Sequence, residues 1–262
     1  MLRAMWSAAS GMHAQQLQID TIANNLANVN TNGFKRSRAE FQDLLYQTVI
    51  APGTQSSATT QTPSGIQLGL GVRPGAVKKL FGQGDVAKTD NPLDVMVEGQ
   101  GFFKVLLPDG NTAYTRDGAF ATDANGQLVN SQGYQVDPAI TIPPDATTIR
   151  IGLDGTVSVT QPGQQAATQV GQMELANFPN PSGLISQGNN LYLATEASGN
   201  AVDGTPGLDG LGALSQGFLE VSNVSIVNEL VNMITAQRAY ELNTRSIKAG
   251  DEMLQQLNNI IR

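Results

Sequence analysis

Two stretches, one near each end of the chain, repeat their apolar positions at alternating spacings of four and three residues. The first lies within residues 2–29 and the second within residues 223–262. Each pattern predicts a helix with a heptad seam. The seam of the first helix consists of Met5, Ala9, Met12, Gln16, Ile19, Ala23 and Leu26. The seam of the second helix consists of Ile226, Leu230, Met233, Gln237, Tyr240, Thr244, Ile247, Asp251, Leu254, Asn258 and Ile261.

The second helix has the length and the pattern of a coiled-coil segment. About 40 residues at about 1.5 Å each give a helix of about 60 Å, and a repeat of that length without internal stops is typical of coiled coils. Polar residues such as Gln16 and Gln237 lie in the seams, where they lower stability but fix register and partner number. A second stripe widens the apolar face of the last helix, so that it can contact more than one neighbour. This stripe contains Val224, Val227, Val231 and Ile234.

The region between the helices, residues 76–221, has the pattern of a β domain. Short apolar runs alternate with Asp-Gly and Asn-Gly pairs, which favour tight hairpin turns. The turn pairs are Asp109-Gly110, Asp117-Gly118, Asn125-Gly126 and Asp154-Gly155. The predicted strands lie at 102–107, 128–129, 149–151, 157–159 and 191–193. The fold class is therefore α+β, with long N- and C-terminal helices that pair as a coiled coil, and with a central, mainly antiparallel β domain.

This pattern divides the chain into three parts. Residues 1–30 and 222–262 form a helical domain, residues 31–75 a connecting segment, and residues 76–221 the β domain. Within the connecting segment, residues 51–65 are polar and lack periodicity, which is typical of a loop or a flexible arm. We expect an extended arm over residues 46–65.

Composition excludes several kinds of chemistry. The chain of 262 residues has no cysteine and one histidine, so thiolate and multi-histidine metal sites are excluded. With 14% charged residues and a net charge of −7, nucleic acid is not expected as a partner. No apolar run reaches the roughly 18 residues of a membrane span. The first residues also lack the apolar core of a cleaved signal peptide.

Three motifs with possible chemistry carry weak signals. His13 lies on the first helix without an acidic residue within one turn, so we read it as an ordinary surface or packing residue. The glycines of residues 69–74 fail the dinucleotide pattern, because Pro74 stands where the third glycine belongs. The basic run 35–38 fits either anion binding or a solvated helix end, and we favour the solvated helix end. We therefore expect no catalytic residue, cofactor or metal.

Three signatures along the chain resemble those of a known family, the axial proteins of the bacterial flagellum, which form its rod and hook. The N-terminal signature covers 23–35, the C-terminal signature lies within 222–241, and residues 99–103 with 114–118 resemble the shared β domain. The N-terminal family motif comprises Asn24, Asn25, Leu26, Asn28, Thr31, Gly33, Phe34 and Lys35. Together these signatures span nearly the whole chain.

Within this family, the chain is most similar to the distal-rod branch. It lacks the large insertion of hook proteins, and residues 41–65 resemble an insertion that distinguishes the distal rod from the hook. The resemblance implies a rod-stiffening arm that includes Tyr46, Pro52, Gly53, Ser56, Ser57, Pro63 and Gly65.

The resemblance implies a structural protein without enzymatic activity. It would self-assemble into a straight, hollow, helical drive shaft that transmits torque and lets later axial proteins pass. Its partners would be further copies of itself, proximal rod proteins, the hook protein and the surrounding envelope rings. It would lie in the basal body between periplasm and outer membrane, exported without a cleaved signal peptide and without spanning the membrane. The alternatives are a proximal rod or hook-type protein and, in a different class, a secreted envelope enzyme or adhesin.

Overall fold

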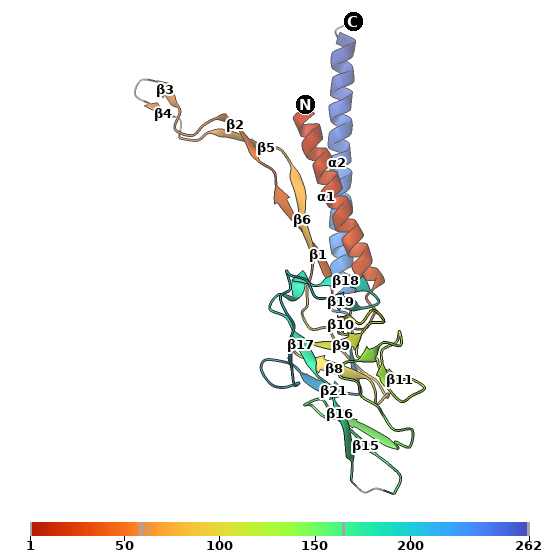
Figure 1. Cartoon of the computed structure of the whole chain (residues 1–262). Coiled ribbons are helices and arrows are strands. Elements are labelled where there is room, and N and C mark those ends of the chain that lie inside the picture. The colour runs from red at the N-terminus through yellow and green to blue at the C-terminus, as the bar shows by residue number, and fades with distance from the viewer. Residues whose placement is uncertain (1, 58–59, 62, 164–165, 261–262) are drawn as a thin grey trace. The chain divides into compact units, whose positions relative to one another are not determined.

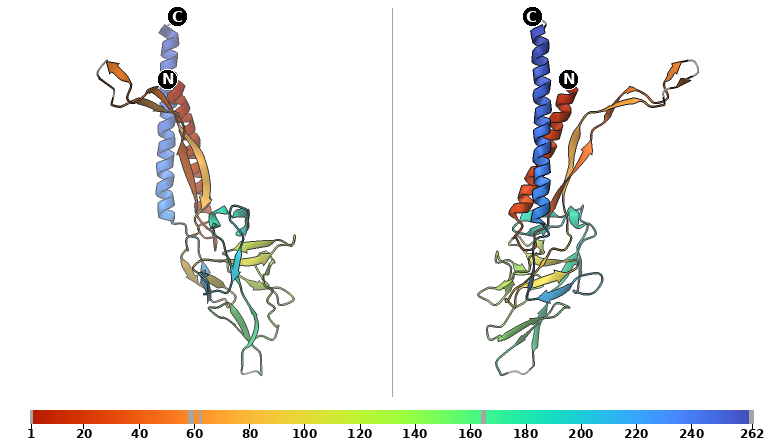
Figure 2. Two further views of the ribbon diagram at one scale, coloured as in Figure 1. Left: turned by 60° about the vertical axis from the view of Figure 1, so that its left-hand side comes forward. Right: turned by 180° about the vertical axis from the view of Figure 1, so that it is seen from behind.

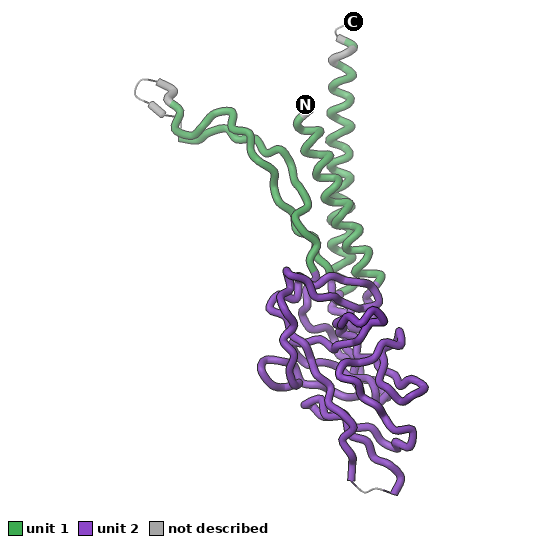
Figure 3. The backbone as a smooth tube through the Cα atoms, viewed as in Figure 1, with its two compact units in different colours: residues 1–27, 37–78, 225–262 green, residues 28–36, 79–224 purple. Residues whose placement is uncertain are grey.

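The computed structural model describes residues 2–57, 60–61, 63–163 and 166–260. A helix lies at each end of the chain and an antiparallel β domain lies between them, which confirms the α+β fold class. The chain forms two compact units, coloured separately in Figure 3. The helix unit comprises residues 1–27, 37–78 and 225–262, and the β unit comprises residues 28–36 and 79–224. The three-domain division drawn from the sequence stays a prediction.

The helix unit is built on α1 (Leu2–Ala27) and α2 (Ile226–Ile260), close to the predicted bounds. The two helices run side by side in opposite directions (Figures 1 and 2). α1 ends where Asn28 opens a turn, in which the Thr31 N–H donates to the Asn28 carbonyl at 3.1 Å. Of the predicted seam, Ile261 and the side chain of Asn258 lie outside the described residues.

Two glycines allow a close approach of α1 and α2. A Cβ atom added to Gly11 would lie 2.9 Å from Asn243 Nδ2, and one added to Gly250 would lie 3.2 Å from Met5 Cγ. Gly11 lowers intrinsic helix propensity by about 1 kcal/mol relative to alanine. In the structure Gly11 lies at the helix contact, where an added Cβ atom would require the Asn243 amide to move.

A two-stranded antiparallel ribbon forms the rest of the helix unit. It pairs β1 (Ser37–Asp43) with β6 (Val72–Lys79), β2 (Tyr46–Ile50) with β5 (Ile66–Gly69), and β3 (Gln55–Ser57) with β4 (Thr60–Gln61). β1 packs against α1, whereas β2 and β5 lead away from both helices (Figures 1 and 2). Of the two readings of 51–65, a loop or an arm, the loop was wrong, because β3 and β4 lie within it. β2 and β5, at the base of this arm, are exposed along their whole length, so no inside–outside alternation was available to mark it in the sequence.

The β unit consists of short strands. They are β7 (Val86–Lys88), β8 (Val95–Glu98), β9 (Phe102–Leu106), β10 (Thr112–Thr115), β11 (Ala121–Thr122), β12 (Leu128–Val129), β13 (Gln135–Val136), β14 (Thr148–Ile151), β15 (Thr156–Thr160), β16 (Thr168–Gln172), β17 (Leu175–Asn177), β18 (Ile185–Gly188), β19 (Leu191–Leu193), β20 (Val202–Gly204), β21 (Ala213–Gln216) and β22 (Phe218–Glu220), with a 3-10 turn at Pro181–Gly183. The largest described sheet runs in the order β11-β12-β13-β9-β10-β19-β18, with β17 also on β9 and β20 on β17. β14, β15 and β16 form a second sheet, and β8 pairs with β21 and β7 with β22.

One of the predicted hairpin turns was wrong. Gly110, Gly126 and Gly155 have the positive φ angles that their turns require. Gly118 instead lies where no side chain fits, since an added Cβ atom would be 1.6 Å from the Val95 carbonyl oxygen. Glycine is needed at this position because two backbone segments approach closely. In the sequence, such a glycine looks the same as the glycine of a turn dipeptide.

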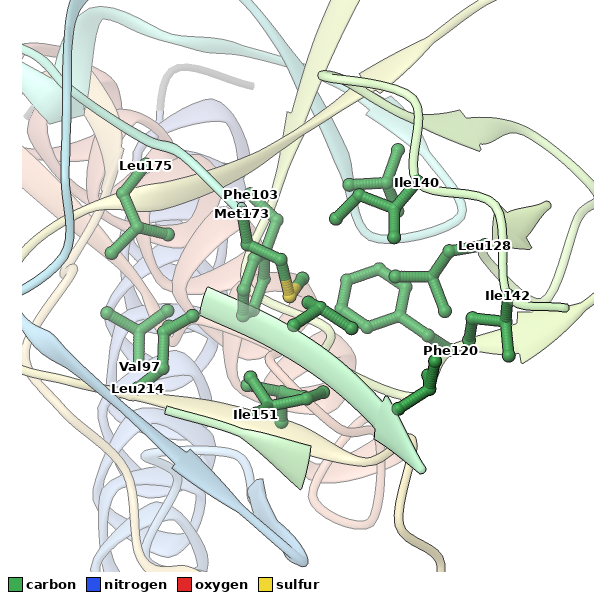
Figure 4. Packing of buried hydrophobic residues seen from close by; sticks show 14 of the residues in the cluster. Val97, Phe103, Phe120, Leu128, Ile140, Ile142, Ile151, Met173, Leu175 and Leu214 are labelled. Atoms are coloured by element: carbon green, nitrogen blue, oxygen red, sulfur yellow. The ribbon is translucent and has the colours of Figure 1, made fainter. Parts of the chain in front are cut away.

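The two units differ in how much apolar surface they bury. Figure 4 shows the main core of the β unit, where Phe103, Met173, Leu175 and their neighbours pack closely. The buried apolar side chains of the helix unit are far smaller. Among the described residues they are Ala8, Ala14, Ile22, Ala39 and Ala236. Because burial stabilises in proportion to apolar area, the helix unit gains much less from its own packing than the β unit does.

Candidate functional site: the motif segment and the exposed helix faces

Asn25 of the family motif joins three elements of the helix unit. The side chain is 1% exposed at the end of α1. Its Nδ2 donates to the Ser37 carbonyl at 2.8 Å and its Oδ1 accepts from the Ser37 N–H at 2.8 Å. Nδ2 also donates to Glu229 Oε2 of α2 at 3.3 Å. One amide thus satisfies the backbone where β1 begins and ties both helices to it.

Replacing Asn25 with alanine is expected to loosen this junction. Two hydrogen bonds to the Ser37 backbone disappear, each contributing about 1 kcal/mol. We expect amide exchange at the end of α1 and the start of β1 to rise by about tenfold or more, since 1.4 kcal/mol is a tenfold change. Gln16→Ala, on the exposed side of the same helix, is the matched control. Equal exchange rates in the two variants would contradict the linking role of Asn25.

At position 33 of the motif, both the backbone conformation and the lack of space favour glycine over any residue with a side chain. Its φ angle is +66°, and its N–H donates to the Glu220 carbonyl at 2.8 Å. An added Cβ atom would lie 2.6 Å from the backbone nitrogen of Asp117. Phe34 follows as a buried ring, with Lys79 Nζ 5.0 Å from its centroid. These contacts hold residues 28–36 in the β unit.

Lys35 completes a buried ion cluster in the β unit. Its side chain has no exposed surface, and its Nζ donates to Glu220 Oε1 at 2.5 Å and to the Gly82 carbonyl at 2.8 Å. Arg116, also buried, donates from Nη1 to Glu220 Oε2 at 3.4 Å and from Nη2 to the Gly99 carbonyl at 2.6 Å. The Gly84 N–H donates to Glu220 Oε1 at 2.8 Å. One carboxylate therefore serves two buried cations.

The cost of burying these cations shows in their pKa values. Burial lowers the pKa of Lys35, and the Glu220 carboxylate acts in the opposite direction. Burial also lowers the pKa of Arg116, again with Glu220 opposing the shift. The expectation that Lys35 lies on a solvated helix end was wrong, since it is enclosed. Only its place in the family motif signalled this, and Glu220 carried no signal in the sequence.

The structure divides the predicted seams between a helix contact and solvent. In α1, Met5, Met12, Ile19 and Leu26 are half-buried, while Ala9, Gln16 and Ala23 are exposed. In α2, Met233, Thr244, Ile247 and Leu254 are half-buried, while Ile226, Leu230, Gln237, Tyr240 and Asp251 are exposed. Met12 and Thr244 meet, with Thr244 Oγ1 3.4 Å from Met12 Sδ. The seams as assembly surfaces stay a prediction, and the buried Ile22 and Glu229 were missed.

Large apolar side chains remain exposed on the helix unit. Val227, Val231 and Ile234, which we call the α2 stripe, are 71%, 54% and 50% exposed. Val224, predicted as part of the same stripe, is instead buried and precedes α2. In the arm, Tyr46 begins β2, Pro52 and Gly53 form a turn, and Gly65 lies against Ile50. Of the other predicted arm residues, Ser56 and Ser57 belong to β3 and Pro63 precedes β5.

Membrane-spanning helices and metal-ligand clusters are both missing from the described part of the chain. No helix there is both long and apolar enough to cross a membrane. Within the same residues, no three His, Asp or Glu side chains come together as a possible metal site.

Comparison with known proteins identifies the class to which these features belong. Residues 5–35 match the family described as "Flagella basal body rod protein", residues 96–159 match "Flagellar hook protein FlgE/F/G D1 domain", and residues 215–260 match "Flagellar basal body rod FlgEFG protein C-terminal". The first match covers Asn25, Gly33 and Lys35, and the third covers Glu220 and the α2 stripe. The chain belongs to the family of flagellar rod and hook proteins.

Full-length relatives narrow this assignment. The flagellar basal-body rod protein FlgG of Buchnera aphidicola subsp. Schizaphis graminum is 55% identical over 99% of this chain and 100% of its own length. The FlgG of Buchnera aphidicola subsp. Acyrthosiphon pisum is 53% identical with the same coverage, and that of Borreliella burgdorferi is 50% identical over the whole of both chains. The similarity is thus to the FlgG basal-body rod proteins, the distal-rod branch.

Proposed function

We propose that this chain, a structural subunit of the distal rod of the flagellar basal body, works by stacking copies of itself into a straight, hollow helical shaft. The observation that supports this most directly is the imbalance within the helix unit. Its helices bury mainly alanines, whereas the α2 stripe and other large apolar side chains face water. Such faces mark interaction sites, and neighbouring copies would cover them.

In the assembled rod, α1 and α2 would pair as a coiled coil and line the inner tube. The half of each seam that faces solvent in the single chain would then contact neighbouring copies. A contact between two different surfaces of the same chain does not close on itself, so it generates a helix of subunits. The β unit would form the outer part of the shaft.

The shaft would carry torque by many shared contacts and would have no active site. Its axial neighbours would be proximal rod proteins and the hook protein, and its lateral neighbours the envelope rings. Later axial proteins would pass through its channel. The subunit would be exported without a cleaved signal peptide and would lie between periplasm and outer membrane. These points rest on the resemblance to the rod family.

Electron microscopy of purified protein at rising concentration tests self-assembly. We expect tubes with a central channel above a threshold concentration, because filament growth is cooperative once the exposed faces are buried. Protein that stays monomeric at every concentration, by sedimentation and by microscopy, would contradict the proposal.

The arm would stiffen the shaft by filling the space between stacked subunits. Deleting residues 50–62 removes the outer part of the ribbon and leaves the paired strands β1 and β6. We expect the shortened protein to polymerise into filaments that are curved or more flexible than those of the full chain, measured as persistence length in micrographs. An unchanged melting temperature of the β unit would verify folding. Straight filaments of unchanged stiffness would contradict this role.

A further inference from the structure

The arm carries an apolar face that its own helices do not cover. In the pairing of β2 with β5, Gln47 lies opposite Leu68, and the Leu44 N–H donates to the Gly71 carbonyl at 2.9 Å. By this register Leu45 lies opposite Leu70, on the same side of the ribbon as Leu68. These three leucines, which we call the arm face, are 85%, 40% and 43% exposed in the order Leu45, Leu70, Leu68.

The direction of the arm face follows from Gly71. A Cβ atom at Gly71 would lie 2.3 Å from Ser10 Oγ, so this residue presses onto α1. The Val72 N–H also donates to Ser10 Oγ at 3.3 Å. Leu44, which pairs with Gly71, is half-buried, whereas Leu45 and Leu70 in the next pair are exposed. The arm face is therefore turned away from the helices of its own chain.

The α2 stripe is likewise out of reach of its own partner helix. At about 100° per residue, Val227, Val231 and Ile234 lie roughly half a turn around α2 from Glu229. Glu229 is 2% exposed and accepts from Asn25 of α1, so it marks the side of α2 that contacts α1. The α2 stripe faces the opposite side, where the described chain offers no cover.

The arm and the first part of α2, which carries the α2 stripe, are both nearly free of charged residues. No Asp, Glu, Lys, Arg or His occurs from residue 44 to residue 72 of the arm. Between residues 226 and 237 of α2, the one charged residue is the buried Glu229. From Arg238 onward α2 is rich in charged residues. If the uncharged arm covered α2 from Arg238 onward, it would remove charged side chains from water without pairing them, which is costly. Covering the α2 stripe carries no such cost, because the stripe is uncharged.

We propose that the arm face of one copy docks on the α2 stripe of a second copy of this chain. The inference rests on the proposed self-assembly and names the surfaces that meet. The two surfaces are different parts of one chain and each faces away from its own helix contact, so the contact is head-to-tail and propagates. The other side of the ribbon, which carries Tyr46, Thr48 and Gln67, stays outside this contact.

Cross-linking between two single-cysteine variants tests this contact, because the chain has no cysteine of its own. Leu68→Cys and Val231→Cys proteins are mixed at an assembling concentration and oxidised. We expect a disulfide-linked dimer that contains one of each. Gln67→Cys, one residue away on the other side of the ribbon, is the control for the arm, and Leu242→Cys, 61% exposed on the charged part of α2, is the control for the helix. Equal cross-linking by either control would overturn the proposal.

The same experiment separates this contact from self-assembly itself. Polymers that sediment without the Leu68–Val231 cross-link would overturn the docking contact and leave the proposed function standing. Absence of polymer at every concentration of the unsubstituted chain would remove the proposed function as well. In the double variant Leu68→Cys/Val231→Cys we expect a covalent ladder of multimers. A disulfide within single chains would show that the chain's own helix is the occupant, and would overturn the proposal.

A charge placed in the contact supplies a second measurement without cysteines. Leu68→Asp is expected to raise the concentration needed for polymerisation by about tenfold or more, because a buried unpaired carboxylate is costly. Gln67→Asp, with the same change of charge on the other side of the ribbon, is expected to change this concentration by less than about threefold, as surface charges contribute little. Circular dichroism of both dilute proteins would verify that they fold alike. Equal effects of the two variants would overturn the docking contact.

Discussion

Replacing Glu220 with glutamine is expected to lower the free energy of unfolding of the β unit by about 3–5 kcal/mol, the range for breaking a buried charge pair. Glu220 is the carboxylate shared by Lys35 and Arg116, and both cations are buried. Glutamine fills nearly the same volume, so the loss isolates the charge. Urea unfolding followed by the near-ultraviolet circular dichroism of Tyr114 and Tyr192, both buried in the β unit, measures the change.

Two further variants show whether charge balance is the reason. Glu196→Gln, at an exposed carboxylate of the same unit, is expected to change stability by less than about 0.5 kcal/mol. Lys35→Met should cost less than Glu220→Gln, since it leaves Arg116 and Glu220 as a neutral pair. If Lys35→Met proved the more destabilising of the two, the cluster would depend on packing around Lys35 more than on its charges.

Replacing Gly33 with alanine is expected to destabilise the β unit by roughly 2–5 kcal/mol. About 1–2 kcal/mol comes from placing a side chain on a left-handed residue, and about 1–3 kcal/mol from overpacking. The added Cβ atom would meet the backbone of Arg116 and Asp117 at 2.7 and 2.6 Å, and backbone atoms cannot turn aside as a flexible side chain can. The same urea titration reports the loss, and we expect faster amide exchange in residues 28–36.

Gly110→Ala is the matched control for this prediction. Gly110 also has a positive φ, +78°, and lies in the same unit, but an added Cβ atom there would meet nothing within 4 Å. It therefore carries the conformational cost without the steric one, and we expect a loss of about 1–2 kcal/mol. Equal losses at the two glycines would show that crowding against residues 116–117 contributes nothing.

Local sequence patterns predicted the elements of this fold well. The heptad spacing placed α1 and α2 within a few residues of their ends, because side chains that recur along one helix face form a pattern in the sequence itself. Apolar runs between turn dipeptides placed β9, β15 and β19. β3 and β4 were not predicted. The neighbouring strands β2 and β5 are exposed on both sides, so an arm of this kind has no alternation of buried and exposed residues that the sequence could show.

The helix contact shows the limit of a one-dimensional pattern. Part of each predicted seam is half-buried, and Met12 meets Thr244 between the helices, whereas Ala9, Gln16 and Leu230 face solvent. Gly11 and Gly250 instead lie at the contact, where small size allows close approach. A heptad pattern records every apolar position together, including those that a neighbouring copy would cover, so it cannot assign each position to its partner.

By itself the sequence determined the α+β class, the two terminal helices and the family, because periodicity, turn dipeptides and motifs are local properties of the chain. Only the tertiary structure showed what the residues of the family motif do. Asn25 meets Ser37 and Glu229, Gly33 fits against residues 116–117, and Lys35 meets Glu220 across 185 positions of sequence. Burial turns such pairings of distant residues into large energies, and no pattern along the chain records which distant residues are brought together. For the same reason, only the fold showed that the arm face and the α2 stripe are both exposed in the described part of their own chain.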